Sequence, residues 1–250
     1  MKVGENVLSY ISVDIYNNQY KAGIQLDSTV LANSLGDVDT IEISRKRYNG
    51  SSWTKIYTIS VEELSDMGFH LLDITALCGT AYSYTIDIKD GTTLIESQIY
   101  DNIKCDFEGM FVGNFSDYYI AVANCSTSTK RNTQVAYVNT LTGRLPYRVS
   151  NAQTNYTTGQ SEGLFLHLTS DKKKFVPDEY TEYATAVIDF LTDGTEKIIK
   201  TNDGQIWFTS IDQAVTLPSN ENYRGYYPIS FTWTEIGDIP ISGMVVENAE

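Results

Sequence analysis

Apolar and polar residues alternate along much of this 250-residue chain. Successive side chains of a strand point to opposite faces of its sheet, so a period of two predicts half-buried β-strands. The clearest run extends from Tyr82 to Lys89, where Tyr or Ile occupies every second position. Asn49-Gly50 and Asp90-Gly91 follow such runs, and these dipeptides favour tight hairpin turns. The sequence therefore predicts a mainly β protein.

One segment departs from this period and predicts an α-helix over about residues 178–192. Pro177 and Asp178 are start signals, and Gly194 suits the C-terminal cap. An apolar stripe follows the helical repeat through Tyr180, Tyr183, Ala184, Val187, Phe190 and Leu191. A single helical turn is also expected over residues 61–67.

The composition changes at residues 106–109, just before a predicted strand over residues 110–112. We place a domain boundary there, which gives domains of residues 1–107 and 108–250. The first is expected to be a β-sandwich. The second is expected to be a β-sandwich or split barrel that carries the one packed helix.

The strands of the second domain are predicted from the same alternation. A hairpin is expected from residues 197–200 and 205–211, and a closing strand over residues 229–233. Strands over residues 134–139 and 147–149 flank a turn, and residues 163–166 are expected to form a further strand.

Charge sets limits on the partners of the chain. It has 32 acidic and 18 basic residues, for a net charge of −14. Binding to nucleic-acid phosphates depends on Lys and Arg, so a sequence-specific nucleic-acid binder is not expected. The same negative field suits either simple solubility or a protein that lets DNA pass without adhesion. No apolar stretch is long enough to enter a membrane, and no signal peptide is expected.

Signatures of catalysis and metal binding are missing from the sequence. The three cysteines, Cys78, Cys105 and Cys125, have no zinc-ligand spacing and favour a reducing compartment. His70 and His167 lie in no known motif, and no nucleotide-binding, G-x-S-x-G or H-E-x-x-H motif occurs. We therefore expect no enzyme, no cofactor and no metal. A glycoside hydrolase with an acid pair from distant strands remains the third hypothesis.

Two kinds of side chain are candidates for a subunit interface. The basic run Lys172, Lys173 and Lys174 is either a solvated loop or a match for an acidic face of a neighbouring subunit. Tyr118 and Tyr226 lie in tyrosine clusters, and Tyr is enriched at protein interfaces. Core packing and carbohydrate stacking are the alternatives for these tyrosines.

Residues 77–86, Leu-Cys-Gly-Thr-Ala-Tyr-Ser-Tyr-Thr-Ile, resemble the segment that opens a late strand in fibronectin type III domains. The resemblance covers roughly 80 residues, and it implies that the predicted N-terminal sandwich is immunoglobulin-like. The Cys and Trp pattern of antibody domains is missing.

The second half resembles tail and baseplate structural proteins of bacteriophages. The segments concerned are residues 137–144, 146–147, 155–156, 163–165, 190–194, 203–207 and 229–237. This resemblance implies the ring-forming domain of distal tail proteins, in which subunits join around the tail channel. In that family the ring domain precedes a sandwich, whereas here the immunoglobulin-like module comes first, so the position along the tail is left open.

The leading hypothesis is thus a non-enzymatic tail or baseplate component that forms a symmetric ring with copies of itself and contacts other tail proteins. Its expected location is the virion, after synthesis in the host cytoplasm. The alternative is a module that binds host-surface polysaccharide through the immunoglobulin-like domain or through the tyrosine-rich loops.

Overall fold

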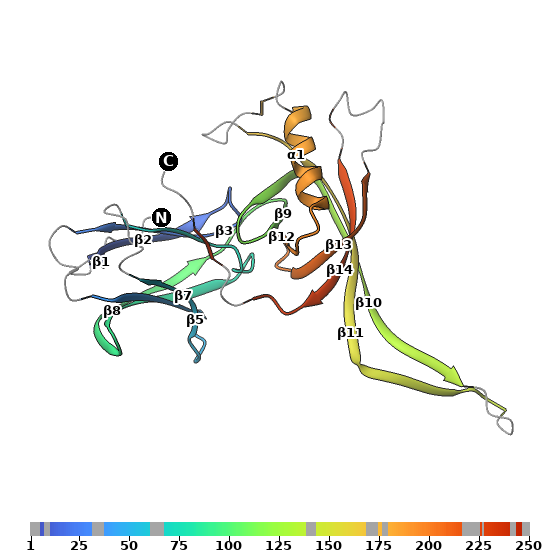
Figure 1. Cartoon of the computed structure of the whole chain (residues 1–250), viewed down its shortest axis with the longest axis horizontal. Coiled ribbons are helices and arrows are strands. Elements are labelled where there is room, and N and C mark those ends of the chain that lie inside the picture. The colour runs from blue at the N-terminus through green and yellow to red at the C-terminus, as the bar shows by residue number, and fades with distance from the viewer. Residues whose placement is uncertain are drawn as a thin grey trace. The chain divides into compact units, whose positions relative to one another are not determined.

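The computed structural model describes residues 6–7, 11–31, 38–60, 68–138, 144–168, 175–176, 180–216, 226, 228–240 and 244–246. Within these residues the chain has fifteen strands and one α-helix (Figure 1). The prediction of a mainly β protein is confirmed. The helical turn expected over residues 61–67 lies outside the described residues.

Two open antiparallel sheets are built mostly from the first hundred residues (Figure 1). The first has the order β1 (Asn6–Val7), β2 (Ile11–Asn18), β3 (Gly23–Val30), β6 (His70–Asp73) and β15 (Met244–Val246). The second has the order β5 (Thr54–Ser60), β4 (Thr40–Arg47), β7 (Ala81–Asp90) and β8 (Thr93–Lys104). Each sheet buries one set of alternating Ile and Leu side chains, such as Leu26 in the first and Ile41 in the second.

The hairpins of the second sheet follow from their turn residues. Asn49 between β4 and β5 has a φ of 62°, a left-handed conformation that Asn adopts more readily than most residues. Gly91 between β7 and β8 has a φ of 55°. Both predicted hairpins are therefore confirmed, and the alternating run from Tyr82 to Lys89 lies inside β7.

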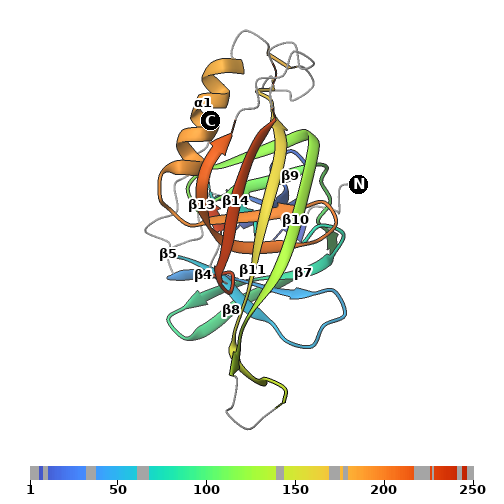
Figure 2. The same ribbon diagram turned by 90° about the vertical axis from the view of Figure 1, so that its right-hand side faces the viewer.

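Six further strands form a closed barrel in the order β10-β11-β14-β13-β12-β9 (Figure 2). They are β9 (Met110–Gly113), β10 (Tyr118–Val138), β11 (Tyr147–Phe165), β12 (Lys197–Thr201), β13 (Ile206–Thr216) and β14 (Ile229–Gly237). The predicted hairpin of β12 and β13 and the closing strand β14 are confirmed. Residues 163–165 are extended as predicted, but they form the end of β11 and not a separate strand, because β11 runs without a break to Phe165.

Strands β10 and β11 form one long antiparallel hairpin, paired from Ala121 and Phe165 out to Val138 and Tyr147. The ladder shifts register between Thr133 and Gln134, where residues 152–154 of β11 are extra. Extra residues bend a strand, and Figure 1 shows β11 bending along its length.

Helix α1 (Tyr180–Thr192) matches the predicted helix and its apolar stripe. It buries Tyr180, Ala184, Val187, Phe190 and Leu191. Tyr183 on the same stripe is half-buried and stacks on His167, with ring centroids 5.2 Å apart. Gly194 follows the helix with a φ of 80°, as a C-terminal cap requires.

By internal contacts the chain divides into two compact units. Unit 1 comprises residues 1–120, 198–207 and 239–250, and unit 2 comprises residues 121–197 and 208–238. No single boundary in the sequence separates the two units, because each consists of several segments. The domain boundary after residue 107 stays a prediction.

Candidate functional site

One face of the sheet in unit 2 carries polar side chains on every strand. Directly paired residues of antiparallel strands lie on the same face, so the register identifies its members. One row across the sheet pairs Ser128 with Gln160 and Gln160 with Thr232. We call this the polar face; its members are Ser126, Ser128, Lys130, Thr158, Gln160, Glu162, Ser210, Ser230, Thr232 and Thr234.

Hydrogen bonds between strands order the polar face. Gln160 Nε2 donates to Ser230 Oγ at 3.2 Å. The Thr234 hydroxyl donates to the Asp212 carboxylate. All members are exposed or half-buried except Ser230, which is 8% exposed. The face is therefore open, hydroxyl-rich and nearly balanced in charge.

The opposite face of the same sheet is buried on β11 and β14, whereas Thr129 and Arg131 of that face on β10 are exposed. Trp233 is fully buried against Gly159, its direct partner on β11. A Cβ at Gly159 would lie 2.2 Å from the Trp233 ring, so only Gly leaves room there. Trp233 Nε1 donates to Ser161 Oγ at 2.9 Å, which satisfies the buried indole. The contrast between the two faces explains why this sheet keeps its register.

A shallow cavity of about 330 Å³ lies along β10, β11, β13 and β14. Among the described residues that line it, Asp212 is the one carboxylate. Glycoside hydrolysis needs two carboxyl groups that flank the substrate. The described lining thus shows one carboxyl group and no acid pair.

The outer end of the β10–β11 hairpin exposes an apolar face. We call residues 134–138 and 147–151 the distal arm. The register pairs Ala136 with Val149 and Val138 with Tyr147, which places all four on one face. Tyr147 is 69% exposed, and Val138 and Val149 are each 49% exposed. Leu145, just before β11, is 78% exposed. An isolated two-stranded ribbon with an apolar face is marginally stable in water, so this face is suited to contact a partner.

The predicted interface tyrosines pack within their own units. Tyr118, in unit 1, is half-buried and stacks on Phe111, with ring centroids 5.8 Å apart. Tyr226, in unit 2, packs edge-on against Phe175 at 4.9 Å and Tyr180 at 5.0 Å. Their interface role remains a prediction. Lys172, Lys173 and Lys174 lie outside the described residues.

A buried ion pair links the two sheets of unit 1. Arg45 Nη1 lies 2.5 Å from Asp73 Oδ2, and Asp73 is 1% exposed. The Tyr84 hydroxyl donates to the same oxygen at 2.7 Å. Burial alone would raise the pKa of Asp73, but the Arg45 charge and the hydrogen bonds from Tyr84 and Thr75 outweigh it, so this pKa is lowered.

A second buried cation, Lys200, lies in the same unit. Its side chain is fully buried, and Nζ donates to the Ala22 carbonyl at 2.5 Å. The amine lies over the rings of Phe107 and Phe111, at 5.3 Å and 5.6 Å from their centroids. Burial lowers the pKa of Lys200, because desolvation disfavours its charged form. Burial likewise raises the pKa of the neighbouring Cys105 thiol to about 11.

Sequence reasoning missed these buried groups. Lys197 and Lys200 flank two isoleucines at the ends of a short strand, a position where lysine is usually solvated. Lys197 is also fully buried, with Nζ 2.6 Å from Asp193 Oδ1 and over the ring of Phe190. Nothing local in the sequence distinguishes such lysines from exposed ones.

The histidines are explained by local contacts. His70 Nδ1 lies 2.9 Å from Asp27 Oδ1, and both side chains are partly exposed.

Among the residues that the structure describes, no cluster of three or more His, Cys, Asp or Glu side chains could hold a metal ion. No helix in this part of the chain is long and apolar enough to cross a membrane.

Comparisons with known proteins add little to this description. No protein-family model matches the chain, and no curated protein matches it. One solved structure, described as "Virion of native gene transfer agent (GTA) particle", is similar over 56% of this chain and 95% of its own, at 12% identity and a TM-score of 0.31. A TM-score of this size carries no argument about fold or function.

Proposed function

We propose that the chain is a non-enzymatic structural component of a bacteriophage tail or baseplate, and that copies of it join in a symmetric ring around the tail channel. The observation that carries the proposal is the polar face of β10, β11, β13 and β14. It is open and hydroxyl-rich, and its opposite side is buried on β11 and β14. This is the surface that a protein conduit for DNA needs.

The chemistry of the polar face suits DNA passage. Among its ten members Lys130 is the only cation, so few counterions would be released on contact with phosphate. The chain as a whole has a net charge of −14, which raises the energy of close approach for DNA. A ring lined by this face would let the polymer slide without adhesion.

The distal arm supports assembly. Its exposed apolar face, formed by Ala136, Val138, Tyr147 and Val149, is buried if the arm lies against a neighbouring subunit. Closed rotational symmetry covers such surfaces on every copy at once. The expected partners are therefore further copies of this chain, together with adjoining tail proteins, and the expected location is the virion.

We further infer that the two open sheets of unit 1 form a fibronectin type III-like module. Without the short edge strands β1 and β15, the orders β2-β3-β6 and β5-β4-β7-β8 are those of a seven-stranded sandwich of this class. Tyr82, near the start of β7, accepts a hydrogen bond from the Leu77 amide at 3.0 Å. This contact has the geometry of the tyrosine corner of such domains.

The oligomeric state tests the proposal. Light scattering coupled to size-exclusion chromatography of the full chain should give a defined multiple of the monomer mass. The double substitution Val138→Asp and Tyr147→Asp should reduce that mass to the monomer while the circular dichroism spectrum is kept. The matched control Ser128→Asp and Gln160→Asp, on the polar face, should leave the assembly intact. A chain that is monomeric at every concentration would contradict the proposal.

A further inference from the structure

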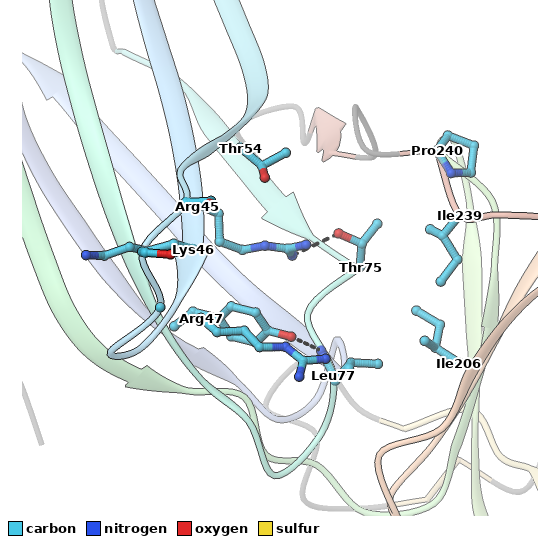
Figure 3. A pocket seen from close by; sticks show the side chains of 13 residues that line it. Arg45, Lys46, Arg47, Thr54, Thr75, Leu77, Ile206, Ile239 and Pro240 are labelled. Atoms are coloured by element: carbon cyan, nitrogen blue, oxygen red, sulfur yellow. Dashed lines mark hydrogen bonds between the residues drawn. The ribbon is translucent and has the colours of Figure 1, made fainter.

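A second cavity, of about 500 Å³, lies wholly within unit 1 (Figure 3). This volume falls in the range of pockets that bind small ligands or peptide side chains. Thirteen described residues line it, of which three are basic and none is acidic, although acidic residues outnumber basic ones in the chain by 32 to 18. The lining residues are Arg45, Lys46, Arg47, Gly50, Ser51, Ser52, Thr54, Thr75, Leu77, Tyr82, Ile206, Ile239 and Pro240.

Of the three cations, two are already engaged. Arg45 is paired with Asp73 and donates to Thr75 Oγ1 at 2.9 Å. Lys46 points away from the cavity in Figure 3, and its Nζ lies 4.6 Å from the centroid of the Trp53 ring. Neither charge is free for a ligand in the cavity.

Arg47 is the cation that remains. It lies two residues after Arg45 on β4, so both side chains are on the same face of the strand. Arg47 is exposed, and no described residue forms an ion pair with it. The hydroxyls of Ser51, Ser52 and Thr54 line the same cavity and are exposed. Guanidinium with nearby hydroxyl donors is a favourable setting for a carboxylate.

The other wall of the cavity is aliphatic. Ile206, Ile239 and Pro240 lie across from the arginines in Figure 3, and all three are half-buried. A ligand that fills the cavity must therefore combine a negative charge with aliphatic surface. Inorganic phosphate meets only the first of these requirements.

A saccharide is disfavoured because the described lining of the cavity offers no free aromatic ring for stacking. Tyr82 is the one aromatic residue in that lining, and it is 4% exposed. Arg45 covers its ring at 4.8 Å, and its hydroxyl accepts from Leu77. Sugar recognition depends on an open ring face, and this ring is already covered on one side.

We propose that this cavity binds an acidic and aliphatic peptide segment of a partner protein, with a carboxylate on Arg47 and aliphatic side chains against Ile206 and Ile239. The proposal does not depend on ring formation. The polar face and the distal arm, from which the ring was argued, lie in unit 2, whereas every residue of this cavity lies in unit 1. It identifies a docking site separate from the distal arm.

The test is a titration of the isotopically labelled full chain, followed by amide NMR. The probe is a capped tetrapeptide of alternating valine and glutamate. Signals from residues 45–54 and 77 should shift in a saturable way. The analogue with glutamine in place of glutamate should bind about tenfold more weakly, the usual scale for a hydrogen-bonded charge. Glucuronate and inorganic phosphate should bind more weakly still.

Three variants distinguish the site from general charge attraction. Arg47→Ala should weaken peptide binding about tenfold. Lys46→Ala, which removes the same charge one residue away, should change it less than about twofold, since only screened long-range attraction is lost. Ile239→Ser should weaken peptide binding but not that of phosphate. Equal effects of Arg47→Ala and Lys46→Ala, tighter binding of glucuronate, or no binding of the peptide would each overturn the proposal.

Discussion

Arg45 on β4 and Asp73 on β6 form a buried ion pair with 2.5 Å between Nη1 and Oδ2, and it joins the two sheets of unit 1. Thr75 completes the arrangement, since its amide and hydroxyl both donate to Asp73 Oδ1, at 2.9 Å and 2.8 Å. With Tyr84 on the other oxygen, both carboxylate oxygens are satisfied. A buried pair contributes to stability only when its partners are satisfied in this way.

Asp73→Asn should destabilise the chain by roughly 3–5 kcal/mol at neutral pH, because it leaves Arg45 without its counter-charge. Urea unfolding followed by circular dichroism measures the loss. Glu42→Gln is the control: Glu42 accepts from Lys89 at 2.6 Å but is partly exposed, so it should cost at most about 1 kcal/mol.

The same pair predicts a pH dependence. The pKa of Asp73 is lowered in the folded state, so its contribution is complete above the pKa of an unfolded aspartate, about 3.9. The contribution is lost as the pH falls from there through the lowered folded pKa. The stability difference between the wild type and Asp73→Asn should therefore shrink below about pH 4. A constant difference down to the acid transition would contradict the assignment.

Tyr82→Phe should destabilise unit 1 by about 1–3 kcal/mol, since the Leu77 amide loses its acceptor. The matched substitution is Tyr100→Phe. The Tyr100 hydroxyl is buried without a hydrogen-bond partner among the described residues, and burial raises the pKa of Tyr100 to about 12. Removing that hydroxyl should be neutral or stabilising. Chemical unfolding of both variants checks the contrast, and equal losses would refute it.

Lys200→Met should change the alkaline side of the stability profile. The pKa of Lys200 is lowered in the folded state, so the unfolded chain binds more protons between the two pKa values. Wild-type stability thus gains a contribution as the pH rises through that window, and the variant lacks it. The difference between wild type and Lys200→Met, measured by unfolding from pH 7 to about 10, isolates this contribution. The exposed substitution Lys55→Met should leave the profile parallel to wild type.

Gly159→Ala should destabilise unit 2 by about 1–3 kcal/mol, because the added Cβ meets the buried Trp233 ring. Tryptophan fluorescence during thermal unfolding follows both the loss and the displacement of the ring. Gly237→Ala on β14 is the control, since nothing lies within 4 Å of its added Cβ. Equal melting temperatures for the two variants would contradict this packing.

The local elements of this fold were predictable because their signals are local. Alternation along residues 82–89 and the helical stripe from Tyr180 to Leu191 each specify an element by themselves. The long β10–β11 hairpin was recognised only in fragments. Its side chains are polar on both faces over much of its length, so no apolar alternation marks it.

The buried polar contacts were beyond prediction because they join distant residues. Lys200 and Ala22 are 178 positions apart, and Arg45 and Asp73 are 28 apart. Strands β15 and β6 are also far apart in the sequence, since Met244 pairs with Asp73. The cavity beside Arg47 likewise combines β4 with residues 206 and 239–240. The sequence predicted Lys172 to Lys174 as the basic interface candidates, whereas the basic residue for which the described structure supports a binding role is Arg47.

Electron microscopy of the purified full chain, at a concentration where its largest species dominates, tests ring assembly most directly. We expect a closed ring in which β10, β11, β13 and β14 present Gln160 and Thr232 to a central channel and the distal arm lies against the next subunit. A monomer, or an assembly that turns this polar face away from its axis, would contradict it.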